Sequence, residues 1–254
     1  VIYPDYHNNT VELRRIDDTI DSVRADKDIT ITSVWLKGYA SPESPYKHNA
    51  ELAIGRTTAL KEHIGQLFHF ADGIIDIDYE PENWEGLREY VATSNIDHRE
   101  EILAMIDSDM EPDAKEWKIK RTYPKEYRFL LQYCYPYLRR TDYRIEYKIR
   151  IFYDVDEIRR VMAEQPQKLS QNEFYLVAKE YEPGTQEFTD VFETAVRMFP
   201  DDPVANLNAA NTALRLGDLK GAETYLGKAG DAPEAVYARG IHAALLKNYD
   251  AAQP

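Results

Sequence analysis

The sequence predicts an α+β protein in two parts, the first mixing strands with helices and the second helical throughout. Residues 29–36 and 143–151 alternate apolar with polar side chains, the pattern of a strand with one buried face. After Phe152 the strand pattern disappears and alanine-rich helical segments follow. We therefore expect a first domain at residues 1–153 and a second, all-α domain at residues 154–254.

Two long helices are expected in the first domain. Asn8 or Asn9 should cap the first of them. Its apolar face would consist of Val11, Ile16, Ile20 and Val23. The second should run over residues 49–68 with Asn49 as its N-cap, because an asparagine oxygen accepts from free N–H groups at a helix start. Its buried side would consist of Leu52, Ala53, Leu60, Ile64, Leu67 and Phe68.

The remainder of the first domain is expected to hold another strand, an insertion and a closing strand. Residues 74–79 are typical of a strand. Residues 82–137 form a polar insertion with helices at 84–91, 99–106, from 114 onward and at 127–133, the last ending before Pro136. In the strand at 143–151 the buried side would consist of Tyr143, Ile145, Tyr147, Ile149 and Ile151, as in an antiparallel sheet covered on one face.

In the second domain, residues 205–222 suggest two paired helices, with Leu216-Gly217-Asp218 as the turn between them. This pattern resembles one repeat of a tetratricopeptide array. Small side chains should lie where the helices approach closely, at Ala210, Ala222 and Ala229. A second copy is expected at residues 237–252 and an earlier, looser copy at residues 174–200. This resemblance implies a helical surface that binds an unidentified protein partner.

Composition excludes several classes of function. The net charge of −14 argues against nucleic acid, whose phosphates need a basic stripe, and disfavours anionic lipid. The single cysteine, Cys134, rules out a disulfide framework and is expected to be a small buried hydrophobe. No run of eighteen apolar residues occurs, so no transmembrane segment is expected.

The sequence holds no recognisable catalytic constellation, so we expect no enzyme, no cofactor and no metal. Its six histidines are scattered, and phosphate-binding glycine loops and zinc motifs are absent. Acidic residues alternate at Asp76, Asp78, Glu80 and Glu82 and could be read as a calcium site. We favour a solvated sheet face, on which like charges usually face water.

Residues 38–64 carry the most informative pattern. A strand ends at Gly38, a loop with two prolines follows, and a helix then holds Asn49, Leu52-Ala53, Arg56-Thr57, Leu60 and Ile64. This gapless order resembles the helix motif of the OmpA-like peptidoglycan-associating domain family. The family's closing strand is matched at residues 142–146 by Arg144 and Glu146. The resemblance spans about residues 1–152 and implies a βαβαβ sandwich, a mixed sheet with helices on one face, whose first strand would precede the first helix.

The resemblance also implies a ligand site for the peptidoglycan stem peptide. Arg56 matches the family arginine that takes the carboxylate of the diamino acid, and a loop entering a helix start favours an anion. Ser41 stands where the family has the aspartate that accepts the ammonium, and Glu43 is the nearest substitute. Tyr39 and Asn49 complete the candidate set.

Two functions remain open. The first is a non-catalytic envelope protein of a Gram-negative bacterium, in the periplasm or at the outer membrane, that holds peptidoglycan weakly through Arg56 and a protein partner through its repeats. The second is a protein-interaction scaffold in envelope or surface-fibre assembly that has lost the peptidoglycan site with the aspartate at position 41.

Overall fold

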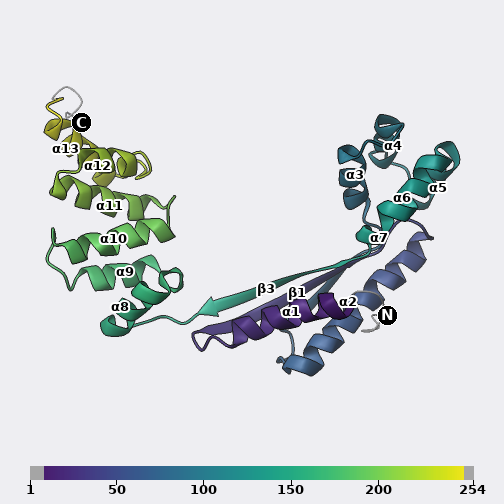
Figure 1. Cartoon of the computed structure of the whole chain (residues 1–254), viewed down its shortest axis with the longest axis horizontal. Helices are drawn as coiled ribbons and strands as arrows, with labels where there is room; N and C mark the ends of the chain where they lie inside the picture. The colour runs from purple at the N-terminus through teal and green to yellow at the C-terminus, as the bar shows by residue number, and fades with distance from the viewer. Residues whose placement is uncertain (1–8, 249–254) are drawn as a thin grey trace. The chain divides into compact units, whose positions relative to one another are not determined.

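The computed structural model describes residues 9–248 of the chain. The chain forms two compact units, Val1–Ile149 and Arg150–Pro254. Figure 1 shows strands in the first unit and a succession of helices in the second. The α+β class expected from the sequence is therefore confirmed.

The sheet of the first unit is mixed and has the strand order β2-β1-β3. Strand β1 (Ile29–Tyr39) lies in the centre, parallel to β2 (Ile75–Glu80) and antiparallel to β3 (Thr141–Ile149). Leu36 of β1 lies opposite Ile77 of β2 and Tyr143 of β3, so these three side chains share one face. The strand that the OmpA-like resemblance places before the first helix falls outside the described residues.

Helices α1 (Asn9–Arg24) and α2 (Tyr46–Phe68) pack against one face of this sheet. Val34 and Leu36 alternate with the partly exposed Trp35 and Lys37 along β1 and point to the helices, where both are fully buried. The core of the unit consists of Leu13, Ile16, Ile20, Val34, Leu36, Leu60, Ile64, Phe68 and Ile75. Burial of these side chains is the main force that joins the helices to the sheet.

Glycine is required at position 38 because α2 crosses β1 closely there. A Cβ atom on Gly38 would lie 2.1 Å from Oγ1 of Thr57 and 2.7 Å from the carbonyl oxygen of Ala53. Thr57 is buried and its hydroxyl donates to that same carbonyl at 2.9 Å. The lack of a side chain at Gly38 therefore lets α2 lie against the strand that leads into the candidate loop.

Several expectations about the two helices were wrong in detail. Val11 and Leu67 are about half exposed, at 51% and 50%, while Leu13 and Thr57 are buried in their place. Helix α2 begins at Tyr46, after an extended Pro45, so Asn49 already lies inside the first turn and is not the N-cap. The N-cap expected at Asn8 or Asn9 falls on side chains outside the described part of the chain.

The buried side expected for the closing strand was also wrong. Tyr143 and Tyr147 are 40% and 49% exposed, and Ile151, at 62%, lies beyond the end of β3. Among the β3 residues, Ile145 packs against the core. The physical reason is the position of the helices, which lie over β1 and β2 and leave the edge strand β3 largely uncovered.

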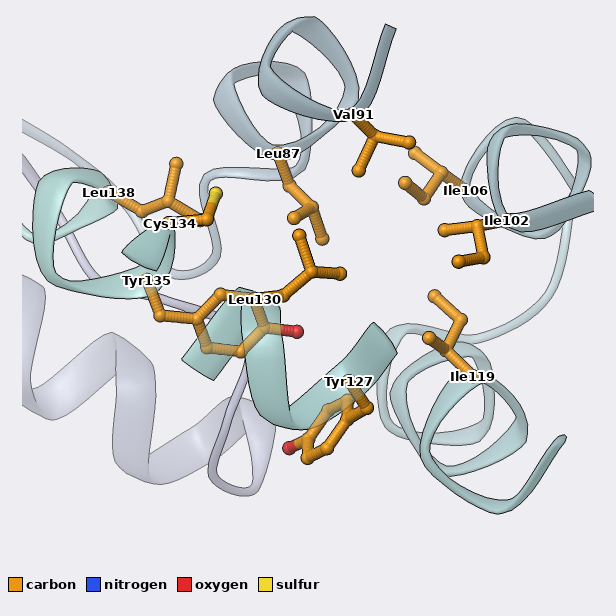
Figure 2. Close-up of a cluster of buried hydrophobic side chains, with 10 residues drawn as sticks. All are labelled: Leu87, Val91, Ile102, Ile106, Ile119, Tyr127, Leu130, Cys134, Tyr135 and Leu138. Carbon is orange, nitrogen blue, oxygen red and sulfur yellow. The ribbon is translucent and has the colours of Figure 1, made fainter. Parts of the chain in front are cut away.

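The insertion folds as a helical subdomain with its own core. Its helices are α3 (Trp84–Thr93), α4 (Arg99–Ile106), α5 (Pro112–Thr122), α6 (Pro124–Tyr133) and the short α7 (Tyr135–Leu138). Figure 2 shows side chains from all five helices converging in this core. Cys134 is buried as expected, and burial raises the pKa of its thiol to about 12. Pro136 lies in the first turn of α7, a position that needs no N–H partner.

The second unit is a succession of helices in which consecutive members pack together. Its elements are α8 (Val155–Glu164), a 3₁₀ turn (Pro166–Lys168), α9 (Gln171–Ala178), α10 (Gln186–Met198), α11 (Pro203–Leu216), α12 (Leu219–Leu226) and α13 (Pro233–Leu245). Ala210, Ala222 and Ala229 are buried as expected, and the first two belong to the core shared by α11, α12 and α13.

The turn between α11 and α12 forms where the sequence places it. Gly217 ends α11 with a positive φ of 77°, and the Asp218 side chain accepts the N–H of Gly221 at the start of α12. Part of the last expected repeat, residues 249–252, lies outside the described residues. Among residues 9–248, no helix has both the length and the apolar character needed to cross a membrane.

Candidate functional site

The candidate site lies where the parallel strands β1 and β2 end, in the loop that leads into α2. Backbone hydrogen bonds hold the loop to its neighbours: the Ala40 N–H donates to the Glu80 carbonyl at 3.3 Å, and the Asn83 N–H donates to the Ala40 carbonyl at 2.9 Å. The Tyr39 N–H donates to the carbonyl of Arg140, just before β3, at 2.8 Å. The carboxyl ends of parallel strands are a frequent place for ligands, which makes this edge the natural candidate.

Ser41 and Glu43 come together around a residue that the sequence analysis missed, Arg139. Nε of Arg139 donates to Oγ of Ser41 at 2.9 Å, and Nη2 donates to Oε2 of Glu43 at 2.5 Å. Ser41 is 2% exposed, whereas Glu43 and Arg139 are partly exposed. Both expected acceptors for a ligand ammonium are therefore bound to a cation of the protein itself.

Arg56 reaches the same place from α2 and is half-buried. Its Nη1 donates to the carbonyl oxygen of Tyr39 at 3.0 Å. Burial lowers the pKa of the Arg56 guanidinium, the charge of Arg139 acts in the same direction, and Glu43 opposes both. Arginine remains charged at physiological pH, so two guanidinium groups share the neighbourhood of one carboxylate.

Tyr39 takes part through its backbone, and its ring lies elsewhere. Tyr39 follows the buried Gly38 in β1, so its side chain points to the sheet face opposite the helices. There Nζ of Lys37 lies 5.3 Å and the guanidinium of Arg140 5.1 Å from the ring centroid. Burial raises the pKa of the Tyr39 phenol.

Asn49 belongs to a buried network and points away from solvent. It is 1% exposed, and its amide nitrogen donates to the Ser44 carbonyl at 2.6 Å and to Oε1 of Glu82 at 2.8 Å. Glu82 is 3% exposed and its Oε2 accepts from Nε1 of Trp84 at 2.7 Å. Burial raises the pKa of Glu82. This network joins the loop, α2 and the start of the insertion, which is a structural role.

The start of α2 already holds an anion from the protein. The Tyr46 N–H, at the first residue of the helix, donates to Oδ1 of Asp113 in α5 at 2.8 Å. A carboxylate at this position satisfies a free N–H and interacts favourably with the helix dipole. Asp113 thus supplies what a bound ligand carboxylate would otherwise supply.

The acidic run after the site divides between two environments. Asp76, Asp78 and Glu80 lie on the open face of the sheet, where Lys37 is 3.8 Å from Asp78 and 3.4 Å from Glu80. Glu82, expected on the same face, is buried beyond the end of β2. Within residues 9–248 no group of three or more His, Cys, Asp or Glu side chains is arranged to hold a metal ion.

Comparison with known proteins identifies no relative. No protein-family model matches the chain, and neither a curated protein nor a solved structure is significantly similar to it. The OmpA-like and tetratricopeptide resemblances therefore rest on the residues quoted above.

Proposed function

We propose that this protein is a non-catalytic interaction scaffold of the Gram-negative cell envelope. In this proposal the first unit keeps an OmpA-like framework but does not use its peptidoglycan site, and the tetratricopeptide-like second unit binds a protein partner. The observation that carries the proposal is the double occupation of the site, by Arg139 on Ser41 and Glu43 and by Asp113 on the start of α2.

The energetic argument concerns what a ligand would have to displace. A diamino acid needs a carboxylate for its ammonium and donors for its own carboxylate. Here the Glu43 carboxylate is bound by Arg139, and the Tyr46 N–H is bound by Asp113. Hydrogen bonds to charged groups contribute about 1.5–3 kcal/mol each, so a ligand that breaks both gains little by replacing them.

The second unit offers exposed apolar side chains for a partner. In α13, Tyr237, Ile241 and Leu245 follow one another at four-residue intervals and therefore lie along one side of the helix. Tyr237 is 73% exposed and Leu245 50% exposed. Helical repeats characteristically bind partners on extended surfaces of this kind, which supports placing the partner site here.

Peptidoglycan association remains a second candidate because of Arg56. Among the described residues its guanidinium makes one hydrogen bond, to the Tyr39 carbonyl, and Arg139 lies close enough to depress its pKa. Two cations beside the single carboxylate of Glu43 leave one positive charge in excess. A ligand carboxylate bridging Arg56 and Arg139 would neutralise it.

Co-sedimentation of the full chain with purified peptidoglycan sacculi separates the two candidates. We expect the protein to remain in the supernatant, and Arg56→Ala to behave like the parent. Arg14→Ala is the matched control, since Arg14 is an exposed arginine on α1. Pelleting that Arg56→Ala abolishes and Arg14→Ala preserves would overturn the scaffold proposal and establish the second candidate.

A further inference from the structure

The insertion contains a cationic region in a strongly acidic chain. Residues 81–113 contain ten Asp or Glu and two Arg, a net charge of −8, whereas residues 114–140 contain eight Lys or Arg and two Asp or Glu, a net charge of +6. The whole chain has a net charge of −14. Six of these eight cations lie on helices α5 and α6, and the other two, Arg139 and Arg140, follow α7.

The outer sides of α5 and α6 combine these cations with exposed aromatic rings. We define the α5–α6 patch as Trp117, Arg121, Lys125, Arg128, Phe129 and Tyr133, all of which are exposed. Helical spacing explains this grouping, because Trp117 and Arg121 are four residues apart on α5, and Lys125, Phe129 and Tyr133 follow at the same interval on α6.

The opposite sides of α5 and α6 pack into the core of the insertion. Figure 2 shows Ile119 of α5 and Leu130 of α6 pointing into the cluster, and both are fully buried. By contrast, the aromatic side chains of the patch are exposed to solvent, Trp117 by 56%, Phe129 by 40% and Tyr133 by 49%. A partner that covers these rings would remove their apolar surface from water, which contributes favourable free energy to binding.

The three cations of the patch, Arg121, Lys125 and Arg128, lack a carboxylate ion-pair partner in the described part of the chain. The Arg121 guanidinium lies 5.0 Å from the Trp117 ring centroid, and Nε of Arg128 donates to the Pro124 carbonyl at 3.2 Å. Several other exposed arginines of the first unit do have carboxylate partners, such as Arg88 with Asp107 and Arg144 with Glu146.

From this combination we infer that the α5–α6 patch is a docking site for an acidic segment of a protein partner. Carboxylates of the segment pair with Arg121, Lys125 and Arg128, and an apolar or aromatic side chain covers the Phe129 and Tyr133 rings, whose centroids are 4.9 Å apart. Tryptophan, tyrosine and arginine are the residues that dominate protein interfaces. This site is separate from the partner surface proposed on the second unit.

A short acidic peptide fits the charge distribution better than an extended polyanion. Helix α4, in the acidic part of the insertion, packs against α5, so a long nucleic acid or a charged membrane surface would meet repulsive carboxylates beside the patch. Charges interact over about 8 Å at physiological ionic strength, which confines the attraction to a segment of patch size. The overall charge of −14 adds to the repulsion of a large polyanion.

Fluorescence anisotropy with the full chain tests the inference. The probe is a labelled synthetic peptide of alternating glutamate and tyrosine, with a lysine–tyrosine peptide as its charge-reversed counterpart. We expect saturable binding of the acidic probe that weakens with added salt. Binding of the basic probe, which the net charge of −14 favours, should be insensitive to substitutions in the patch. Absence of saturable binding of the acidic probe at millimolar protein concentration overturns the inference.

A matched pair of variants locates the binding. Arg121→Gln, Lys125→Gln and Arg128→Gln together should weaken binding about tenfold, as expected for three exposed charge pairs. The control combines Arg14→Gln, Lys61→Gln and Lys148→Gln, which remove the same charge from exposed positions elsewhere in the first unit and should change affinity less than about twofold. Equal affinities in the two triple variants, both folded by circular dichroism, overturn the inference.

Competing occupants give different results. If a twenty-nucleotide oligothymidine or phosphatidylglycerol vesicles bind more tightly than the acidic peptide, the occupant of the patch is another polyanion and the peptide proposal is wrong. A dimer in sedimentation velocity that the patch variant dissolves would assign the surface to a second copy of the chain. The peptide proposal stands when neither occurs and the patch variant weakens the probe. None of these results depends on the sacculus experiment.

Discussion

Asp113 in α5 accepts the backbone N–H of Tyr46 at the first residue of α2, with 2.8 Å between oxygen and nitrogen, although the two residues are 67 positions apart in the chain. The insertion therefore folds back and supplies an anion to the helix start that precedes Arg56. This contact connects the insertion to the candidate ligand site and explains why the two cannot be considered separately.

Replacing Asp113 by Asn should destabilise the first unit by about 0.5–1 kcal/mol, since a carboxylate at a helix start contributes about that much. The three tryptophans, Trp35, Trp84 and Trp117, all lie in the first unit, so tryptophan fluorescence during urea unfolding reports that unit alone. Asp109→Asn removes the same charge from an exposed position and should have little effect. Equal losses in both variants would contradict a specific role for the Tyr46 contact.

Gly38→Ala should destabilise the first unit by about 1–3 kcal/mol, because the added methyl group would overlap Thr57 and the Ala53 carbonyl and force α2 away from β1. Gly55→Ala is the matched control within α2, where an added Cβ meets nothing within 4 Å. There the substitution should stabilise the helix, by up to about 1 kcal/mol. Fluorescence-monitored thermal unfolding gives both values. Similar melting temperatures for the two variants would refute the close approach of helix and strand.

The buried Glu82 should make stability fall as the pH rises. Its carboxyl pKa is raised in the folded protein, chiefly by burial, above an unfolded value of about 4.3. Below the unfolded pKa both states hold the proton, and between the two pKa values the folded state alone retains it. The stabilisation from this proton is therefore complete at low pH and is lost as the pH rises through the raised pKa.

Glu82→Gln removes this titration. Relative to the variant, the parent should be more stable at pH 4 than at pH 7, with a change of about 1.4 kcal/mol for each unit by which the pKa is raised. Urea unfolding at the two pH values measures it, and Glu85→Gln, an exposed neighbour, serves as control. A difference between parent and Glu82→Gln that does not vary with pH would show that the carboxyl titrates equally in both states.

Much of the first unit's architecture follows from local pattern. Alternation predicted β1, β2 and β3, and helical periodicity predicted α1, α2 and most of the insertion, because both signals depend on residues within a few positions of each other. The turn at Gly217 was predictable for the same reason, since a glycine with positive φ ends a helix through its own backbone. The errors concern side chains whose exposure depends on the width of the sheet, such as Tyr143 and Tyr147.

In the candidate site too, some features follow from local sequence and others from tertiary packing. The sequence by itself brought Ser41 and Glu43 into one loop and put Arg56 on the helix that follows, because these residues are close along the chain. Only the tertiary structure decided that Arg139 binds Ser41 and Glu43, that Asp113 occupies the helix start and that Asn49 turns inward to Glu82. These partners come from 33 to 98 positions away, and no local periodicity records which distant charge the packed chain brings into contact.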